Sequence, residues 1–108
     1  MIEVRRYLSE DGRDFFGEWL KKLKDRRARA QIETRLTRLS LGNFGDCKPI
    51  AAGVSELRIH FGSGYRVYYG MEKQTIVLLL CGGDKRTQDR DIEKAIERWN
   101  DHRQRSKL

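Results

Sequence analysis

The clearest structural signal in the sequence is ELRIHFGSGYRVYYG, residues 56–70. Two runs in which apolar and polar residues alternate flank the sequence Gly-Ser-Gly. Alternation over five to seven residues on either side of a short glycine-containing connection is typical of a β-hairpin. The hairpin sets the two faces of the sheet, and the rest of the chain can be arranged around it.

The two faces of this hairpin differ in chemistry, because alternate side chains of a strand point in opposite directions. The apolar face, predicted to pack on the core, comprises Leu57, Ile59, Phe61, Tyr65, Val67, Tyr69 and Met71. The other face comprises Glu56, Arg58, His60, Arg66 and Tyr68. Paired strands share their faces, so we expect this second set to converge on one side of the sheet.

The segments before the hairpin predict a strand and helical structure. Residues 2–8 alternate as a half-buried strand does. Apolar residues at helical spacing follow in residues 15–23 and again in residues 28–39. Either two antiparallel helices joined near residues 24–26 or one bent helix fits this pattern. Residues 42–53, rich in glycine, predict a loop with at most a short edge strand.

The segments after the hairpin complete the fold. Residues 76–81 are apolar at every position, which indicates a central strand covered on both faces. A last helix carries Ile92, Ala95, Ile96 and Trp99 on one side and begins at Thr87 or Asp89. The order predicts a single α+β domain over residues 1–108. Its two N-terminal helices pack on a twisted antiparallel sheet, and a C-terminal helix follows.

Charge is the most informative feature of the composition. The 108 residues carry a net charge of +7, and residues 21–38 hold eight Lys/Arg against two acids. Such a surface attracts phosphate backbones or acidic proteins, although a solvated helix face explains the helical part by itself. The sequence shows no membrane-length apolar run and no signal peptide, and it contains only two cysteines. We therefore expect a reduced, cytoplasmic protein without membrane association.

The polar face of the hairpin suits phosphate chemistry. RNA cleavage without a metal removes a proton from a 2′-hydroxyl, stabilises charge on phosphorus and protonates the departing oxygen. Arg58 and Arg66 match phosphate oxygens bidentately, and His60 exchanges protons near neutral pH. Lys85 and Arg86 follow the central strand and would lie at the rim of the same surface if that strand neighbours the hairpin.

Simpler explanations exist for several of these residues. His60 taken alone is better explained as an exposed strand residue, and Glu56 with Arg58 as an ordinary cross-strand charge pair. Asp84, Asp89 and Asp91 are better explained as helix-capping acids than as metal ligands. The sequence has neither zinc-ligand spacing nor a phosphate-binding glycine loop.

Two blocks of the chain together resemble a known family. GNFGDCKPIAAGVSELRIHFGSGYRVYY, residues 42–69, and LLLCGGDKRTQDRDIEKA, residues 78–95, closely resemble the phage-derived, HigB-like branch of the RelE/ParE toxin superfamily. Members are toxins of type II toxin–antitoxin modules, often labelled addiction module killer proteins. The resemblance covers nearly the whole chain, including FFGEWL at residues 15–20 and the basic segment after it.

The resemblance implies an activity and partners. RelE-like and HigB-like members are endoribonucleases that cut mRNA in the ribosomal A site without a metal or cofactor. The expected partners are therefore the ribosome, mRNA and a cognate antitoxin that blocks the active surface. Contact with DNA would be indirect, through the toxin–antitoxin complex.

The resemblance also assigns roles to individual residues. Arg66 matches the arginine at the scissile phosphate, and Arg58 and Glu56 fall where RelE-like toxins have lysines. His60 suits HigB-like enzymes that use a histidine. The expected catalytic residues are thus Arg66, His60, Arg58, Arg86 and Glu56, and the expected RNA-binding residues are Lys85, Tyr68, Arg58 and Arg66.

The resemblance leaves two other functions open. No tyrosine follows Tyr69, although several ribonuclease members have a C-terminal one. This absence and the replacement of a lysine by Glu56 favour a ParE-like inhibitor of DNA gyrase that cuts no RNA. A toxin that has lost activity and only binds its antitoxin is the third possibility.

Overall fold

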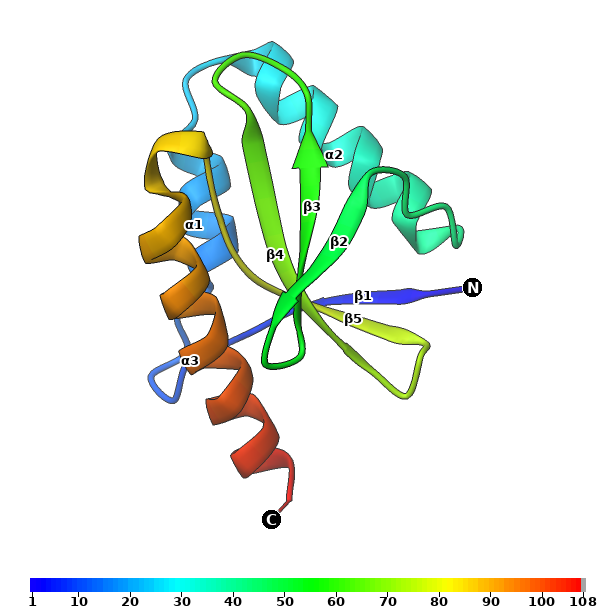
Figure 1. Ribbon diagram of the computed structural model, residues 1–108, viewed down its shortest axis with the longest axis vertical. Helices are drawn as coiled ribbons and strands as arrows, with labels where there is room; N and C mark the ends of the chain where they lie inside the picture. The colour runs from blue at the N-terminus through cyan, green and yellow to red at the C-terminus, as the bar shows by residue number, and fades with distance from the viewer. Residues whose placement is uncertain (108) are drawn as a thin grey trace.

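The computed structural model describes residues 1–107, and Figure 1 shows a twisted sheet with helices packed around it. The strands are β1 (Glu3–Arg6), β2 (Cys47–Ala51), β3 (Val54–Ile59), β4 (Tyr65–Glu72) and β5 (Ile76–Gly83). The helices are α1 (Phe15–Lys22), α2 (Arg26–Ser40), the short 3₁₀ helix η1 (Lys85–Thr87) and α3 (Gln88–Ser106). The predicted α+β class, with two N-terminal helices and a C-terminal one, is confirmed. Over residues 1–107, no helix has the length and apolar character of a membrane span.

The sheet is mixed, with the strand order β1-β5-β4-β3-β2. Strands β2 to β5 form an antiparallel meander, as predicted. The prediction of a wholly antiparallel sheet is wrong for β1, which runs parallel to β5 with Val4 opposite Val77. The chain leaves β1 at one edge of the sheet, and α1 and α2 carry it to β2 at the opposite edge. The parallel neighbour β5 comes only after the other three strands, so its pairing with β1 has no local sequence signal.

The basic N-terminal region forms two helices and not one bent helix. The side chain of Asp14 accepts from the backbone N–H of Gly17 at 2.9 Å and caps α1. The side chain of Asp25 accepts from the backbone N–H groups of Arg27 at 2.9 Å and Ala28 at 3.3 Å and caps α2. Leu23 between them is extended, so the chain turns before α2 begins.

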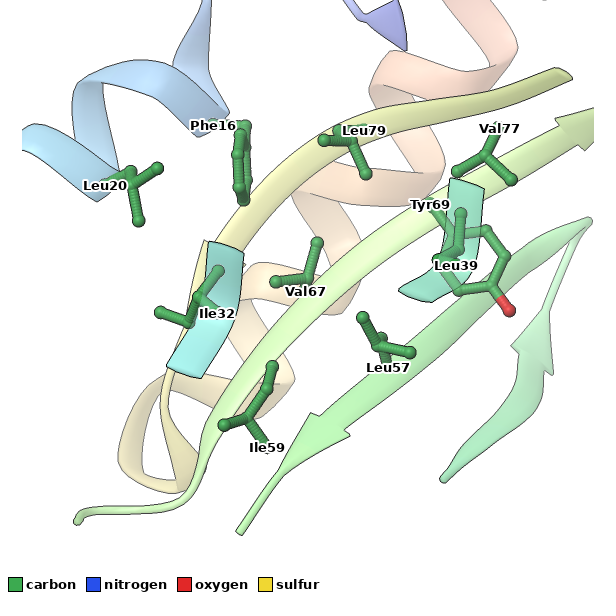
Figure 2. Close-up of a cluster of buried hydrophobic side chains, with 10 residues drawn as sticks. All are labelled: Phe16, Leu20, Ile32, Leu39, Leu57, Ile59, Val67, Tyr69, Val77 and Leu79. Atoms are coloured by element: carbon green, nitrogen blue, oxygen red, sulfur yellow. The ribbon is translucent and has the colours of Figure 1, made fainter. Parts of the chain in front are cut away.

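Two apolar cores lie on opposite faces of the sheet. The core under α1 and α2 comprises Phe16, Leu20, Ile32, Leu39, Leu57, Ile59, Val67, Tyr69, Val77 and Leu79 (Figure 2). The core under α3 comprises Tyr7, Val54, Tyr68, Leu78, Leu80, Cys81, Ala95 and Trp99. Strand β5 contributes to both cores, which confirms the prediction of a central strand covered on both faces.

A register shift near the end of β5 decides what each of its last residues faces. Tyr68 pairs with Cys81 but Tyr69 pairs with Leu79, so Leu80 is the extra residue. After the shift, Gly82 faces α1: a Cβ built there would lie 2.2 Å from Cε3 of Trp19. Helix α1 therefore approaches β5 more closely at Gly82 than a residue with a side chain would allow.

We predict that Gly82→Ala lowers the free energy of unfolding by about 1–3 kcal/mol, because the new methyl group overpacks the contact with the Trp19 ring. Urea denaturation followed by circular dichroism measures this change. In a Trp19→Leu background the same substitution should cost clearly less, since the obstructing ring is gone. Equal costs in both backgrounds would contradict the packing explanation.

Candidate functional site

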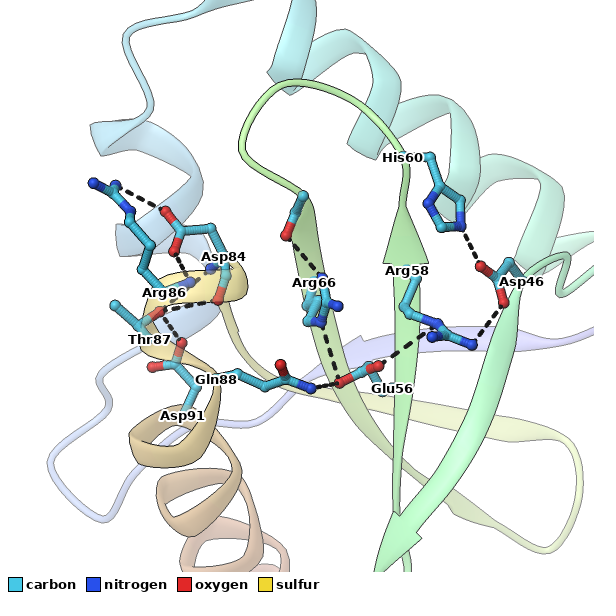
Figure 3. Close-up of polar contacts among 11 residues, drawn as sticks. Asp46, Glu56, Arg58, His60, Arg66, Asp84, Arg86, Thr87, Gln88 and Asp91 are labelled. Carbon is cyan, nitrogen blue, oxygen red and sulfur yellow. Dashed lines mark hydrogen bonds and ion pairs between the residues drawn. The ribbon is translucent and has the colours of Figure 1, made fainter.

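A buried carboxylate lies at the centre of the polar face of the hairpin. Glu56 of β3 is 0% exposed. Its Oε1 lies 3.7 Å from Nε of Arg58, and its Oε2 lies 3.4 Å from Nε of Arg66 (Figure 3). Gln88, the first residue of α3, donates from Nε2 to the same Oε2 at 3.1 Å. One carboxylate thus joins two strands and a helix and holds two guanidiniums side by side.

The sheet register explains why these groups meet. Arg58 of β3 lies directly opposite Arg66 of β4, and Glu56 lies opposite Tyr68. Two like charges directly opposite each other on neighbouring strands repel. The negative charge of Glu56 next to both arginines offsets that repulsion, and this is the physical reason for an acid inside the sheet.

On one side of Glu56, the contacts of the site continue from Arg58 to the edge of the sheet. Nη2 of Arg58 lies 3.4 Å from Oδ1 of Asp46, and the other oxygen of Asp46 bonds Nε2 of His60. These contacts hold the pKa of Asp46 below its usual value, chiefly through the His60 hydrogen bond and also through the charge of Arg58. His60 is exposed, with 74% of its side chain accessible, so its ring is open to a ligand.

On the other side of Glu56, the contacts of the site continue to the turn between β3 and β4. Arg66 donates from Nη1 to the carbonyl of Gly64 at 3.0 Å, and only 13% of its side chain is exposed. A Cβ built on Gly64 would lie 3.5 Å from Nη1 of Arg66 and 3.6 Å from Cβ of Lys85. Lys85 and Arg66 are therefore neighbours across this turn. The pairing of Arg66 with Gly83 brings the end of β5 next to the hairpin, an adjacency that the sequence left open.

Asp84 fixes the basic turn after β5. Its side chain accepts from the backbone N–H of Arg86 at 2.8 Å, and the hydroxyl of Thr87 accepts from the backbone N–H of Asp84 at 3.3 Å. Nη2 of Arg86 lies 3.1 Å from Oδ2 of Asp84, which lowers the pKa of that carboxyl. The Arg86 side chain is 83% exposed, so it remains accessible at the rim of the surface.

Tyr68 does not offer a surface for a base. Its side chain is 0% exposed, in the core under α3. Burial, with the nearby charge of Glu56 as a second cause, raises the pKa of its phenol. Its hydroxyl has no hydrogen-bond partner among residues 1–107. Stacking on RNA requires an exposed ring, so the expected contact of Tyr68 with RNA does not agree with this geometry.

The other predicted site residues divide into two groups. Glu56, Arg58 and Arg66 form one contiguous cluster with His60 at one end, and Lys85 and Arg86 lie at its rim. Glu56 is enclosed by its partners, so a direct proton transfer between Glu56 and a substrate does not agree with the geometry either. The roles of the other five residues stay predictions.

Sequence reasoning missed Asp46, and one signal could have found it. Lys48 pairs with Glu56 in the antiparallel ladder between β2 and β3. Continuing that register by two residues brings Asp46 opposite Arg58, and the backbone N–H of Arg58 indeed donates to the carbonyl of Asp46 at 3.0 Å. The sequence of residues 42–53 predicts at most a short edge strand and gives no pairing register, so it does not by itself place Asp46 opposite Arg58.

The residues near the site do not gather as metal ligands. Within residues 1–107, no group of three or more His, Cys, Asp and Glu side chains is arranged to hold a metal ion. Asp84 caps η1, and Asp91 in the first turn of α3 accepts from the hydroxyl of Thr87 at 2.5 Å.

The fold and the site define a small basic α+β protein with paired arginines on one face of its sheet. The chain belongs to the family described as Phage derived protein Gp49-like (DUF891), whose sequence model matches residues 8–100. This family is of the addiction-module toxin type. The chain is also similar to an uncharacterized protein of Haemophilus influenzae, with 55% identity over 80 residues. The match covers 74% of this chain and 81% of that protein.

We predict that Glu56→Gln lowers the free energy of unfolding by about 2–4 kcal/mol, because the opposed guanidiniums of Arg58 and Arg66 lose their counter-charge. Chemical denaturation at neutral pH measures the loss. Glu33→Gln is the matched control, because it removes the same charge at an exposed position of α2. A Glu56→Gln protein as stable as the control would contradict the role assigned to this carboxylate.

Proposed function

We propose that this protein is a toxin of the RelE/HigB type that cleaves mRNA on the ribosome. The observation that carries the proposal is the pair Arg58 and Arg66, held by the buried Glu56 beside the exposed His60. Guanidiniums fixed before a substrate arrives can stabilise charge that develops on phosphorus without reorganising. An imidazole at the end of the same array supplies acid–base chemistry near neutral pH.

The proposed reaction uses the 2′-hydroxyl of the RNA as nucleophile. His60 accepts the proton of this hydroxyl, and the 2′-oxygen forms a bond to phosphorus. The bond between phosphorus and the 5′-oxygen breaks, which gives a 2′,3′-cyclic phosphate and a 5′-hydroxyl. Arg66 and Arg58 bind the phosphate oxygens during this step. The 5′-oxygen takes up a proton, and we assign its delivery to the ammonium group of Lys85, the neighbour of Arg66.

Glu56 has a different role in this scheme from that of a general base. A base must come within hydrogen-bond distance of the proton that it removes. Glu56 is 0% exposed and lies against Arg58, Arg66 and Gln88, so its contribution is to hold the two arginines. Arg86, which is exposed at the rim, binds a phosphate of the same RNA strand.

The proposed partners follow from the family and the charge. A toxin of an addiction module is neutralised by a cognate antitoxin, which we expect to cover the arginine pair. The ribosome and its mRNA are the proposed targets, and the net charge of +7 suits a protein that enters a cavity lined by RNA. The proposed site of action is the cytoplasm, and neither a metal nor an organic cofactor takes part.

A ParE-like gyrase inhibitor is the second candidate function. The observation that favours it is the burial of Tyr68 and Glu56, which removes two of the expected groups from contact with a substrate. An arginine-rich surface with few proton-transfer groups fits binding to another macromolecule as well as cleavage.

We predict that Arg66→Ala reduces ribosome-dependent cleavage of mRNA by about 100-fold to 1,000-fold, the usual cost of removing one preorganised charge-stabilising group. Primer extension on a defined message, in cell-free translation with and without ribosomes, measures the cuts. Arg103→Ala is the control for net charge, since Arg103 is exposed near the end of α3.

Two outcomes would contradict the proposed nuclease activity. Normal cleavage by Arg66→Ala would exclude the central role of this arginine. An intact message with the wild-type protein would exclude cleavage itself, and inhibition of gyrase supercoiling by the same preparation would then support the second candidate.

A further inference from the structure

A carboxylate that the proposed reaction does not use lies directly behind His60. Asp46 precedes β2, and its Oδ2 bonds Nε2 of His60 while its Oδ1 faces Nη2 of Arg58 at 3.4 Å. Because its pKa is held below the usual value, Asp46 is ionised at neutral pH and can only accept hydrogen bonds. Nε2 of His60 must therefore carry the proton in this contact, which leaves the lone pair on Nδ1.

The loop that carries Asp46 is itself held from the other face of the sheet. Arg35 of α2 donates from Nη1 to the carbonyl of Arg58 at 2.5 Å. Its Nη2 donates to the carbonyls of Phe44 at 3.1 Å and Asp46 at 3.3 Å. Gly45 between them has a φ of +67°, and a Cβ there would lie 2.9 Å from Nη2 of Arg35. One guanidinium thus fixes Asp46 relative to the strand that leads to His60.

We infer that Asp46 is a positioning residue for His60: it orients the ring, fixes its tautomer so that Nδ1 receives the substrate proton, and stabilises the imidazolium that results. This inference rests on the proposed function for its catalytic part, whereas the contact itself can be tested without any activity. The arrangement supplies what a histidine base needs, namely a partner for the nitrogen that does not face the substrate.

The charges around His60 give the direction of the expected effect. Asp46 faces its ring from the segment before β2, and Arg58 of β3 and Arg35 of α2 face the same carboxylate. The negative charge of Asp46 attracts the positive charge that the imidazole gains when it takes up a proton. Asp46→Asn removes this charge with little change of shape, and its amide can donate as well as accept a hydrogen bond, so it no longer fixes the proton on Nε2 of His60.

The first test is NMR spectroscopy of the imidazole nitrogens of the full chain, whose signals show which ring nitrogen carries the proton. The protein has two histidines, and His102, which bonds Glu72 and stacks on Trp99, serves as an internal reference. In Asp46→Asn the nitrogen signals of His60 should change, because the proton is no longer held on Nε2, with those of His102 unchanged. Asp11→Asn is the matched control, because Asp11 is an exposed loop aspartate that also accepts from a neighbouring side chain.

A second variant keeps this test valid if Asp46→Asn disturbs the loop. Asp46→Glu retains the carboxylate, so its His60 nitrogen signals should stay closer to those of the wild-type protein than the signals of Asp46→Asn do. Unchanged His60 signals in folded Asp46→Asn would overturn the inference, and so would equal changes in the two variants.

The second test is a double-mutant cycle on cleavage of ribosome-bound mRNA. Asp46→Asn should lower the saturating rate about 10-fold with little change in half-saturating concentration. In a His60→Gln background it should have little further effect, because it acts through His60. A full additional loss in that background would mean that Asp46 acts through Arg58, which would overturn the inference.

These two tests separate the inference from the proposed function. If the wild-type protein cuts no message, the proposed function fails, but the NMR signals of His60 still decide whether Asp46 holds its ring. If cleavage is found and neither the NMR signals nor the double-mutant cycle link the two residues, only the inference fails.

Discussion

The ion pairs of Glu56 with Arg58 and Arg66 are the interaction on which the site depends. A carboxylate that is 0% exposed loses its hydration, and the loss is offset only if charged partners surround it. Here the partners come from β3, β4 and the start of α3, so the sheet and the helix must both be in position before these partners surround the carboxylate. The same requirement fixes the positions of the two guanidiniums.

The packing of the helices on the sheet explains how α3 reaches this carboxylate. The indole of Trp99 lies against Gly70 of β4, where a Cβ would come within 2.2 Å of the ring. At Gly83 the helix approaches as closely, with a built Cβ 1.8 Å from Oδ2 of Asp91. These glycines let α3 lie directly on the sheet, Gly83 at its first turn and Gly70 further along the helix. Gln88 consequently reaches Glu56, and the basic turn before it borders the site.

Two side chains of opposite charge hold the chain segments that border the site on its two sides. Asp84 organises the turn that carries Arg86, and Arg35 organises the loop that carries Asp46. Both act through backbone groups, so they set the positions of whole segments and not only of single side chains. The exposed members of the site, His60 and Arg86, each have an aspartate beside them that limits their freedom.

Periodicity along the chain was enough to predict the α+β class, the central strand and the two faces of the hairpin, because it is a local property. From that alone the cluster of Glu56, Arg58 and Arg66 could be predicted. The folded structure was needed to show that β1 runs parallel to β5, that Tyr68 and Glu56 are enclosed, and that Asp46 meets His60. Burial, strand partners and contacts between distant segments depend on how the layers close over one another, and no local pattern of residues encodes that.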